Sequence, residues 1–189
     1  MEPRILILYG TTEGQTRKIA GALAATLRSA DADVDVRAGH DPVNDPRPEE
    51  YDAVIVAASV HAGGYQRGVR RWVAAHATEL ASKPTAFVSV CLGVLEHNPK
   101  TDKDLAAIMT KFFVTTGWRP SITKVVAGAL PYTKYNWLKR LVMRRIAAKV
   151  SRDTDTRRDY EYTDWNDVRA FAREFLRMFE RVHGLPAAG

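Results

Sequence analysis

The segment YGTTEGQT, from Tyr9 to Thr16, places hydroxyl and carboxamide groups between an apolar run and a helical pattern. Glycines at positions 10 and 14 let the backbone approach a ligand closely, and the N–H groups at a helix start attract anions. We therefore expect neutral donors to hold a phosphate group here. The expected binding residues are Thr11, Thr12, Glu13, Gly14, Gln15 and Thr16. A plain strand–helix turn with an N-cap threonine is the alternative for this loop alone.

Several other catalytic and phosphate-binding motifs do not fit this sequence. A Walker loop needs a lysine after its second glycine, but Gln15 follows Gly14, so nucleotide hydrolysis is disfavoured. The loop also lacks the dinucleotide-binding G-x-G-x-x-G, and no G-x-S-x-G nucleophile motif occurs. The five histidines are scattered, so no metal site is expected.

Two further loops carry glycines and aromatic or polar side chains directly after apolar runs of strand length. In doubly wound sheets, ligands bind outside the carboxyl ends of the strands, so we expect these loops to flank a flat ring. The expected contacts come from Ser59, Val60, His61, Gly63, Tyr65, Val90, Cys91, Leu92 and Gly93. Exposed loop positions are the alternative for His61 and Tyr65. Cys91 is expected to be a small buried residue rather than a reactive thiol.

Strand-length apolar runs alternate with helical patterns along the chain, which predicts an α/β fold with a parallel sheet covered on both faces. Strands are expected at 5–9, 33–38 (partly exposed), 53–59, 85–93 and 124–130. Helices are expected at about 16–29, 68–80, 102–116 and 164–182. One domain covering residues 1–189 is expected, and residues 131–161 form an insertion longer than ordinary strand–helix loops.

The composition is that of a soluble globular protein, with one cysteine that fits a reducing, cytoplasmic setting. No apolar run is long enough for a signal peptide or a membrane span. The net charge of +6 is local, because residues 105–152 contain ten basic residues and no Asp or Glu. A local basic patch of this kind points to an anionic partner.

Several segments together resemble one family. They are LILYGTTEGQTRKIA, YDAVIVAASVHAGGYQ, SVCLG, WRP…VVAGALPYTKYNW and TDTRRDYEYTDW…FAREF, and they cover nearly the whole chain in order. In these segments the chain resembles the flavodoxin-like, menaquinone-dependent protoporphyrinogen IX dehydrogenases. The aromatic and basic insertion followed by TDTR and YTDW is the part that separates this family from carrier flavodoxins.

The resemblance implies a flavodoxin-like, five-stranded parallel sheet of order 2-1-3-4-5 that binds FMN. It implies oxidation of protoporphyrinogen IX to protoporphyrin IX in haem biosynthesis, with electrons passed to menaquinone. By motif, residues 11–16 would hold the FMN phosphate, and the loops after Ser59 and Val90 would flank the isoalloxazine. The residues expected to close the site are Thr154, Asp155 and Thr156. None of His61, Glu96 and Tyr65 stands out as a catalytic base, so the catalytic residues stay unassigned.

The insertion contains an amphipathic helical pattern, in which apolar residues repeat every four positions from Leu138 to Val150 and basic residues crowd the flanks. Such a helix suits an anionic membrane surface, and its arginines and aromatic rings also suit a tetrapyrrole with propionates. The residues expected to contact substrate or membrane are Tyr132, Tyr135, Trp137, Lys139, Arg140, Arg144 and Arg145. The alternatives are a helix packed on its own domain and nucleic-acid binding, for which no recognised motif is present.

The expected partners are therefore protoporphyrinogen IX, menaquinone and the inner face of the cell membrane, to which a cytoplasmic protein would attach peripherally. No nucleic acid is expected, and a homo-oligomer is left open. Three rival functions remain: an electron-carrier flavodoxin, a flavodoxin-like NAD(P)H:quinone reductase, and a non-enzymatic adaptor. A carrier would not need the carboxylate-free basic insertion, and an adaptor would not need the phosphate loop. The reductase is the closest rival, because nicotinamide can bind a flavin face without leaving a sequence fingerprint.

Overall fold

The computed structural model describes residues 2–39, 45–96, 98–130 and 157–184. The strands are β1 (Arg4–Gly10), β2 (Asp33–Ala38), β3 (Ala53–Ser59), β4 (Thr85–Cys91), β5 (Ile122–Ala127), β6 (Ala129–Leu130) and β7 (Tyr160–Glu161). The α-helices are α1 (Gln15–Arg28), α2 (Arg67–Ala75), α3 (Ala77–Ala81), α4 (Pro99–Thr116) and α6 (Trp165–Val182). Two short 3₁₀ helices, η1 (Pro48–Glu50) and η2 (Gly93–Glu96), lie in connections.

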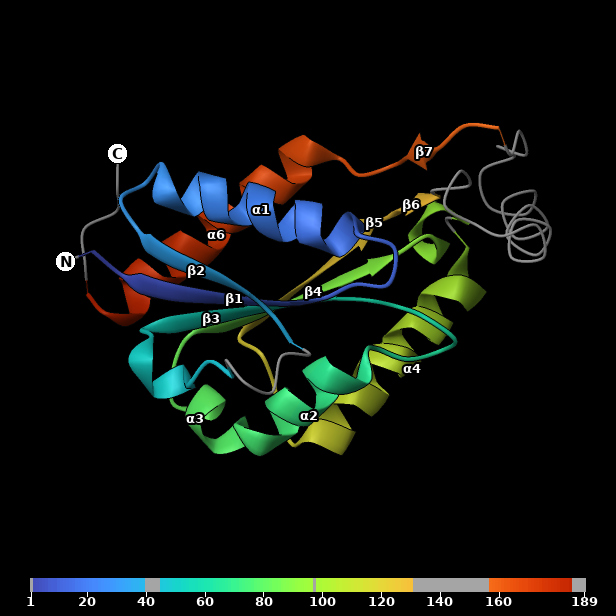
Figure 1. The fold of residues 1–189 in the computed structure, drawn as a ribbon. Helices are drawn as coiled ribbons and strands as arrows, with labels where there is room; N and C mark the ends of the chain where they lie inside the picture. Colours follow the sequence, from blue (N-terminus) through green and yellow to red (C-terminus); the bar gives the residue numbers. More distant parts are fainter. Residues whose placement is uncertain (1, 40–44, 97, 131–156, 185–189) are drawn as a thin grey trace.

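The main sheet has five parallel strands in the order β2-β1-β3-β4-β5 (Figure 1). β1 lies between β2 and β3, so that Ile7 pairs with Val36 on one side and with Ile55 on the other. The fold class and the strand order expected from the sequence are confirmed. The order reverses between β1 and β3, and in this fold class ligands bind at the carboxyl ends of the strands beside that switch point.

Helices cover both faces of the sheet, and successive strand residues alternate between the two faces because the side-chain period of a strand is two. Ile5 and Ile7 of β1 belong to the core cluster under α1 and α6, whereas Leu6 and Leu8 belong to the cluster under α2, α3 and α4. Figure 1 shows α1 and α6 together on one side of the sheet and the other three helices opposite. Each face is closed by a helical layer, which explains the near-continuous burial of β1, β3 and β4.

The α2/α4 face is dominated by aromatic rings. Phe87 of β4 stacks on Phe112 of α4 with ring centroids 5.1 Å apart. Trp118 packs edge-on against Phe87, Phe112 and Phe113, at 6.0, 6.5 and 5.9 Å. Such offset and edge-to-face pairs add stability beyond their buried area, and this cluster anchors α4 to the sheet.

The prediction of one continuous helix at residues 68–80 is wrong, because the helix is interrupted within this range. The structure has two helices, α2 and α3, separated at His76, whose backbone angles (φ −116°, ψ 21°) are not helical. Val69, Val73 and Leu80 are all buried and keep one helical period across the break. Hydrophobic periodicity alone therefore could not reveal it.

The fifth predicted strand, residues 124–130, is also corrected. β5 runs from Ile122 to Ala127, and the last two residues of the predicted strand instead form β6, which pairs antiparallel with β7 (Ala129 with Glu161, Leu130 with Tyr160). The third predicted helix, at about 102–116, begins earlier than expected: α4 starts at Pro99, with Asn98 as its N-cap. Asn98 Oδ1 accepts from the N–H groups of Lys100 and Thr101, which is the usual N-cap pattern.

Most of the expected insertion, residues 131–156, lies outside the described residues. Its two described flanks are held together by the β6–β7 pair. Tyr160 and Tyr162 stack there with ring centroids 6.4 Å apart. None of the helices in the described part of the chain has the length and apolar character to cross a bilayer.

Candidate functional site

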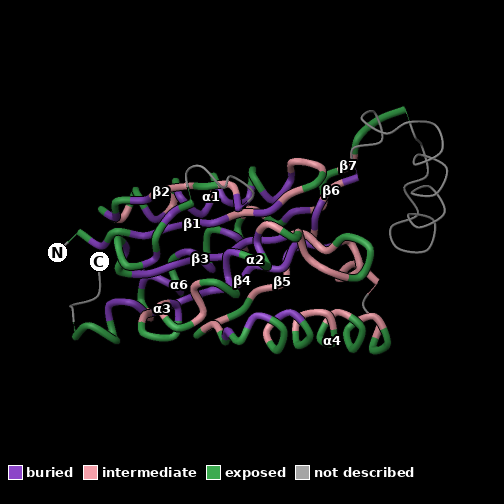
Figure 2. The backbone as a smooth tube through the Cα atoms, turned by 60° about the horizontal axis from the view of Figure 1, so that its bottom comes forward, coloured by how far each residue is buried: buried purple, intermediate pink, exposed green. Residues whose placement is uncertain are grey.

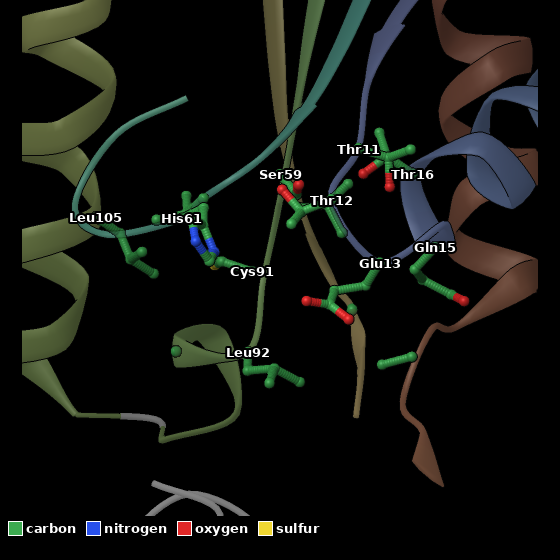
Figure 3. Close-up of a pocket in the computed structure, with 15 residues that line it drawn as sticks. Thr11, Thr12, Glu13, Gln15, Thr16, Ser59, His61, Cys91, Leu92 and Leu105 are labelled. Atoms are coloured by element: carbon green, nitrogen blue, oxygen red, sulfur yellow. The ribbon is translucent and has the colours of Figure 1, made fainter. Parts of the chain in front are cut away.

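A cavity of about 320 Å³ lies at the carboxyl end of the sheet (Figure 3). It is bounded by the loops that follow β1, β3, β4 and β5 and by one residue of α4. The lining consists of Thr11, Thr12, Glu13, Gln15, Thr16, Ser59, Val60, His61, Val90, Cys91, Leu92, Gly93, Leu105, Gly128 and Ala129. Three of the loops that the sequence analysis singled out separately therefore meet around one space, at the place predicted for a doubly wound sheet.

The β1–α1 loop is shaped to present its backbone. The N–H of Gly14 donates to Thr11 Oγ1 (2.9 Å), and Gly14 has φ +97°, a left-handed conformation that favours glycine. α1 starts at the next residue, so its first N–H groups have no intrahelical acceptor. No side-chain cap occupies that helix start, so the N-cap threonine considered as the alternative is not what the structure contains.

The Thr16 hydroxyl is the strongest indication that this loop binds a ligand. Its side chain is fully buried, and its Oγ1 has no hydrogen-bond partner. An unpaired buried hydroxyl is unfavourable by roughly 1–3 kcal/mol, so a partner that arrives with the ligand would relieve it. Figure 3 shows Thr11, Thr12 and Thr16 gathered at one end of the cavity, with His61, Leu92 and Leu105 toward the other.

Gln15 fixes the loop to the far strand of the sheet. Its Nε2 donates to Thr163 Oγ1 at 2.9 Å, and that hydroxyl donates to the carbonyl of Ala127 at 2.7 Å. Gln15 is buried, as is Thr163. This relay connects the start of α1 with the end of β5 and holds Gln15 in place. Thr163 was not anticipated from the sequence, because a contact across 148 residues leaves no local pattern.

Gln66, another residue that the sequence analysis missed, connects two of the lining loops. Its Nε2 donates to Ser59 Oγ (2.7 Å) and to Thr12 Oγ1 (3.2 Å). The close approach explains Gly10: a Cβ there would lie 2.8 Å from Gln66 Oε1 and 2.5 Å from Val69 Cγ2. The lack of a side chain at Gly10 thus lets α2 pack closely against the end of β1, and Gly10 does not line the cavity.

The loop after β3 places His61 on a tight turn. The His61 N–H donates to the Gly64 carbonyl (2.8 Å), and the Gly64 N–H donates to the His61 carbonyl (3.1 Å). Ala62 and Gly63 both have positive φ, at 48° and 74°. His61 lines the cavity, whereas Gly63 lies in the turn and does not. The predicted ligand contact of Gly63 is thus replaced by a role in shaping the loop.

Tyr65 does not reach the cavity lining, contrary to its predicted stacking role. Its ring packs edge-on against Phe87 and Phe112, each 5.0 Å away, and its hydroxyl bonds Ser89 Oγ at 2.8 Å. Burial raises the pKa of Tyr65 to about 12. Tyr65 therefore belongs to the aromatic core beneath the site.

The end of β4 supplies the opposite wall. Cys91 is 7% exposed, and burial raises the pKa of its thiol above the usual value. This agrees with the expected small buried residue rather than a reactive thiolate. The backbone here is tied to both neighbouring loops, because Val60 N–H donates to Val90 O (2.9 Å) and Gly128 N–H donates to Cys91 O (3.3 Å).

The sequence analysis missed three lining residues, Leu105, Gly128 and Ala129. Leu105 falls within the helix expected at 102–116, and Gly128 and Ala129 fall near the end of the strand expected at 124–130. Gly14 lines a smaller neighbouring cavity of about 150 Å³, beside Lys18 and Glu161. The other predicted site residues, Thr154, Asp155 and Thr156 with Tyr132, Tyr135, Trp137, Lys139, Arg140, Arg144 and Arg145, lie outside the described residues.

One group of possible metal ligands occurs among the described residues, away from this cavity. Glu49 of η1 lies near His76 and Glu79, with ligand atoms of the three within 4.8 Å of one another. The scattered spacing of the histidines gave no sign of this group, because the fold brings it together. No ion is assigned to it.

Comparisons with known proteins agree with this architecture. Residues 6–157 match the model of a flavodoxin domain family. The chain is 38% identical over 178 residues to a protein of Escherichia coli K12 named protoporphyrinogen IX dehydrogenase [quinone], covering 94% of this chain and 97% of that protein. A Leishmania major protein of the same name is 33% identical over 194 residues, covering 98% of this chain and 80% of that protein.

Among solved structures, a short-chain flavodoxin associated with a bacterial microcompartment superposes with a TM-score of 0.58, at 13% identity. The match covers 93% of this chain and 98% of that one. At this identity the likeness concerns the fold alone. It supports the flavodoxin-like fold of this chain.

Proposed function

Since this chain belongs to the flavodoxin-domain family of quinone-dependent protoporphyrinogen IX dehydrogenases, we propose that it oxidises protoporphyrinogen IX to protoporphyrin IX in haem biosynthesis. We propose FMN as its cofactor and menaquinone as its electron acceptor. The observation that carries the proposal is the cavity lining, in which neutral donors and an unpaired buried hydroxyl stand at one end and largely apolar groups at the other. Such a site suits a phosphate joined to an uncharged flat ring.

The donor set fits a flavin monophosphate. Residues 11–16 offer the N–H groups of a helix start and three threonine hydroxyls, and Thr16 Oγ1 lacks any other partner. The described residues that line the cavity include no lysine or arginine. Fixed dipoles would therefore hold the phosphate, as helix starts do in many phosphate sites.

At the opposite end the chain offers backbone groups and apolar side chains. Residues 60–61 and 90–93 would flank the ring, with Val60, Leu92 and Leu105 excluding water from it. When bound, a flavin supplies two-electron oxidation, which neither this lining nor any side chain provides. Glu13 and His61 line the same space and are able to hold a proton released by a substrate.

The basic insertion would bring the substrates to the site. Residues 105–152 hold ten basic residues without an Asp or Glu, and both the porphyrinogen and the quinone partition into membranes. We propose that Arg140, Arg144 and Arg145 pair with propionates or anionic lipid headgroups. Tyr132, Tyr135, Trp137 and Lys139 would complete this surface, and residues 154–156 would close the flavin site. A cytoplasmic protein would thereby attach to the inner face of the membrane.

Anaerobic mixing tests the reaction directly. The purified protein should carry a flavin absorption spectrum, and protoporphyrinogen IX should bleach it while a menaquinone analogue restores it. If the flavin stays oxidised with the porphyrinogen but bleaches with NADPH, the quinone reductase is the correct assignment. If neither reductant acts and only a protein donor does, the chain is a carrier.

Deleting residues 133–152 tests the insertion separately. Flavin binding should remain, because described residues outside this segment line both ends of the cavity. Sedimentation with vesicles containing anionic lipid should be lost, together with turnover of the porphyrinogen. Unchanged turnover in the deletion variant would remove the role given to the insertion.

A further inference from the structure

The side chain of Gln66 touches two cavity-lining loops from behind without lining the cavity itself. Gln66 is the N-cap residue of α2, yet its side chain makes no capping bond. Its Nε2 instead reaches Ser59 Oγ at the end of β3 (2.7 Å) and Thr12 Oγ1 in the β1–α1 loop (3.2 Å). One amide nitrogen, which carries two protons, thus serves two hydroxyls.

The direction of these two bonds decides what the hydroxyls can do. A hydroxyl has a single proton and two lone pairs, so an oxygen that accepts from an amide keeps its own proton for another acceptor. Both Ser59 and Thr12 line the cavity, and within the described residues no acceptor is found for either proton. The amide therefore leaves both hydroxyls as donors toward the space where a ligand would sit.

The other end of the amide lies against the end of β1. Gln66 Oε1 is buried and has no partner, which is unfavourable for a carbonyl oxygen. It stands against Gly10, where a Cβ would meet it at 2.8 Å. The glycine at the end of β1 and the glutamine at the start of α2 thus fit one another.

We infer that Gln66 is a positioning residue that makes the site select a flavin with a phosphate over the same flavin without one. It does so by fixing Thr12 and Ser59 as hydrogen-bond donors, which a phosphate oxygen can accept. The inference rests on the proposed flavin binding and adds a basis for its selectivity. Gln66 itself touches neither phosphate nor ring.

Titrating the full-length apoprotein with FMN and with riboflavin, followed by quenching of flavin fluorescence, tests this. In Gln66→Met, which keeps the side-chain length, the affinity for FMN should fall about tenfold and that for riboflavin less than about twofold. In Gln66→Glu the carboxylate can only accept, so both hydroxyls turn toward it. The FMN affinity should then fall further, about 100-fold, with charge repulsion contributing. Arg67→Met, at the exposed neighbouring position, should change neither affinity.

A double-variant comparison shows whether Gln66 acts through the hydroxyls. Gln66→Met combined with Ser59→Ala should lose less FMN affinity than the two single losses multiplied together. Equal loss of both flavins in Gln66→Met would mean a merely structural role and overturn the inference. No change in either affinity would overturn it as well, and both outcomes would leave the proposed function intact. If the unmodified protein binds neither flavin, the proposed function falls along with it.

Discussion

The two ends of the cavity are built in different ways. The end formed by residues 11–16 is fixed by the hydrogen bond from Gly14 N–H to Thr11 Oγ1 and by the bond from Gln15 to Thr163, which in turn donates to the carbonyl of Ala127. The other end is formed by residues 90–93 and by Leu105 of α4, where apolar side chains and backbone groups face the space. The first end suits tight, directional binding of an anion. The second suits a flat, uncharged ring, for which shape matters more than hydrogen bonds.

The helices next to the two ends, α1 and α4, differ in how many of their residues are buried. In α1, half of the residues are buried: Gln15, Thr16, Ile19, Ala20, Leu23, Ala24 and Leu27. In the longer α4 only Phe112 and Thr116 are buried. Figure 2 shows residues of intermediate or full exposure along most of this helix. A helix with few buried contacts has low local stability. We therefore expect the phosphate end to be rigid and the ring end to adapt to its ligand.

Among the substitutions that compare the two ends of the cavity, Thr16→Val should have the largest effect, because it removes the unpaired hydroxyl while conserving shape. Loss of one hydrogen bond to a charged phosphate should weaken FMN binding by about 30-fold, or about 2 kcal/mol. Riboflavin binding should change little. Titration by fluorescence quenching measures both affinities. Thr26→Val is the matched control, since that hydroxyl bonds Ala22 O on the same helix and does not line the cavity.

Gly14→Ala should weaken FMN binding by about tenfold through the shape of the loop alone. A Cβ at Gly14 meets nothing within 4 Å, but φ +97° is strained for alanine, by about 1–2 kcal/mol. Gly21→Ala is the control, because its Cβ also meets nothing and its backbone is helical. Chemical denaturation should show the first variant destabilised and the second stabilised by about 0.5–1 kcal/mol. Equal effects of the two substitutions would contradict the strain assigned to Gly14.

Leu105→Ala examines the ring end. It should weaken FMN and riboflavin alike, each by about threefold, because a half-buried leucine contributes apolar contact without recognising the phosphate. Val114→Ala on the same helix, where the residue is 73% exposed, should change neither affinity. A selective loss of FMN in Leu105→Ala would show that the two ends of the cavity do not divide their tasks as described.

The sequence predicted the rigid end of the cavity better than the adaptable one. The strand–glycine–hydroxyl pattern of residues 9–16 is local, so this part of the cavity lining could be located from a few neighbouring residues. Leu105, Gln66 and Thr163 enter the site only through tertiary contacts, and nothing in their sequence neighbourhoods distinguishes them from core or surface residues. The expected ring contact of Tyr65 failed for the same reason. Its position in a glycine-rich loop does not show that its side chain packs against Phe87 and Phe112.

The strands of the sheet could be predicted because buried parallel strands are nearly continuous apolar runs, as in 53–59 and 85–91. Their order was implied by the family resemblance and not by these runs. The boundaries of the helices and strands could be predicted less well. The split between α2 and α3 preserves the helical period of buried residues, and the end of β5 depends on the pairing of β6 with β7 across the insertion. Periodicity reports which face is buried, whereas these boundaries depend on partners distant in sequence.

The smallest effect is expected where the β7 strand meets α1. Lys18 Nζ contacts Glu161 Oε2 at 2.7 Å, and the hydrogen bond from Lys18 lowers the pKa of the Glu161 carboxyl. A lowered pKa stabilises the fold at pH values above that of an unfolded glutamate, about 4.3, and the contribution disappears as the pH falls through the folded value. Because both side chains are substantially exposed, at 63% and 35%, Glu161→Gln should cost only a few tenths of a kcal/mol at neutral pH. Denaturation of the protein and the variant at pH 7 and at pH 3 should show the gap closing in acid. A gap that persists at pH 3 would mean that Glu161 stabilises the β7 segment through contacts other than its charge.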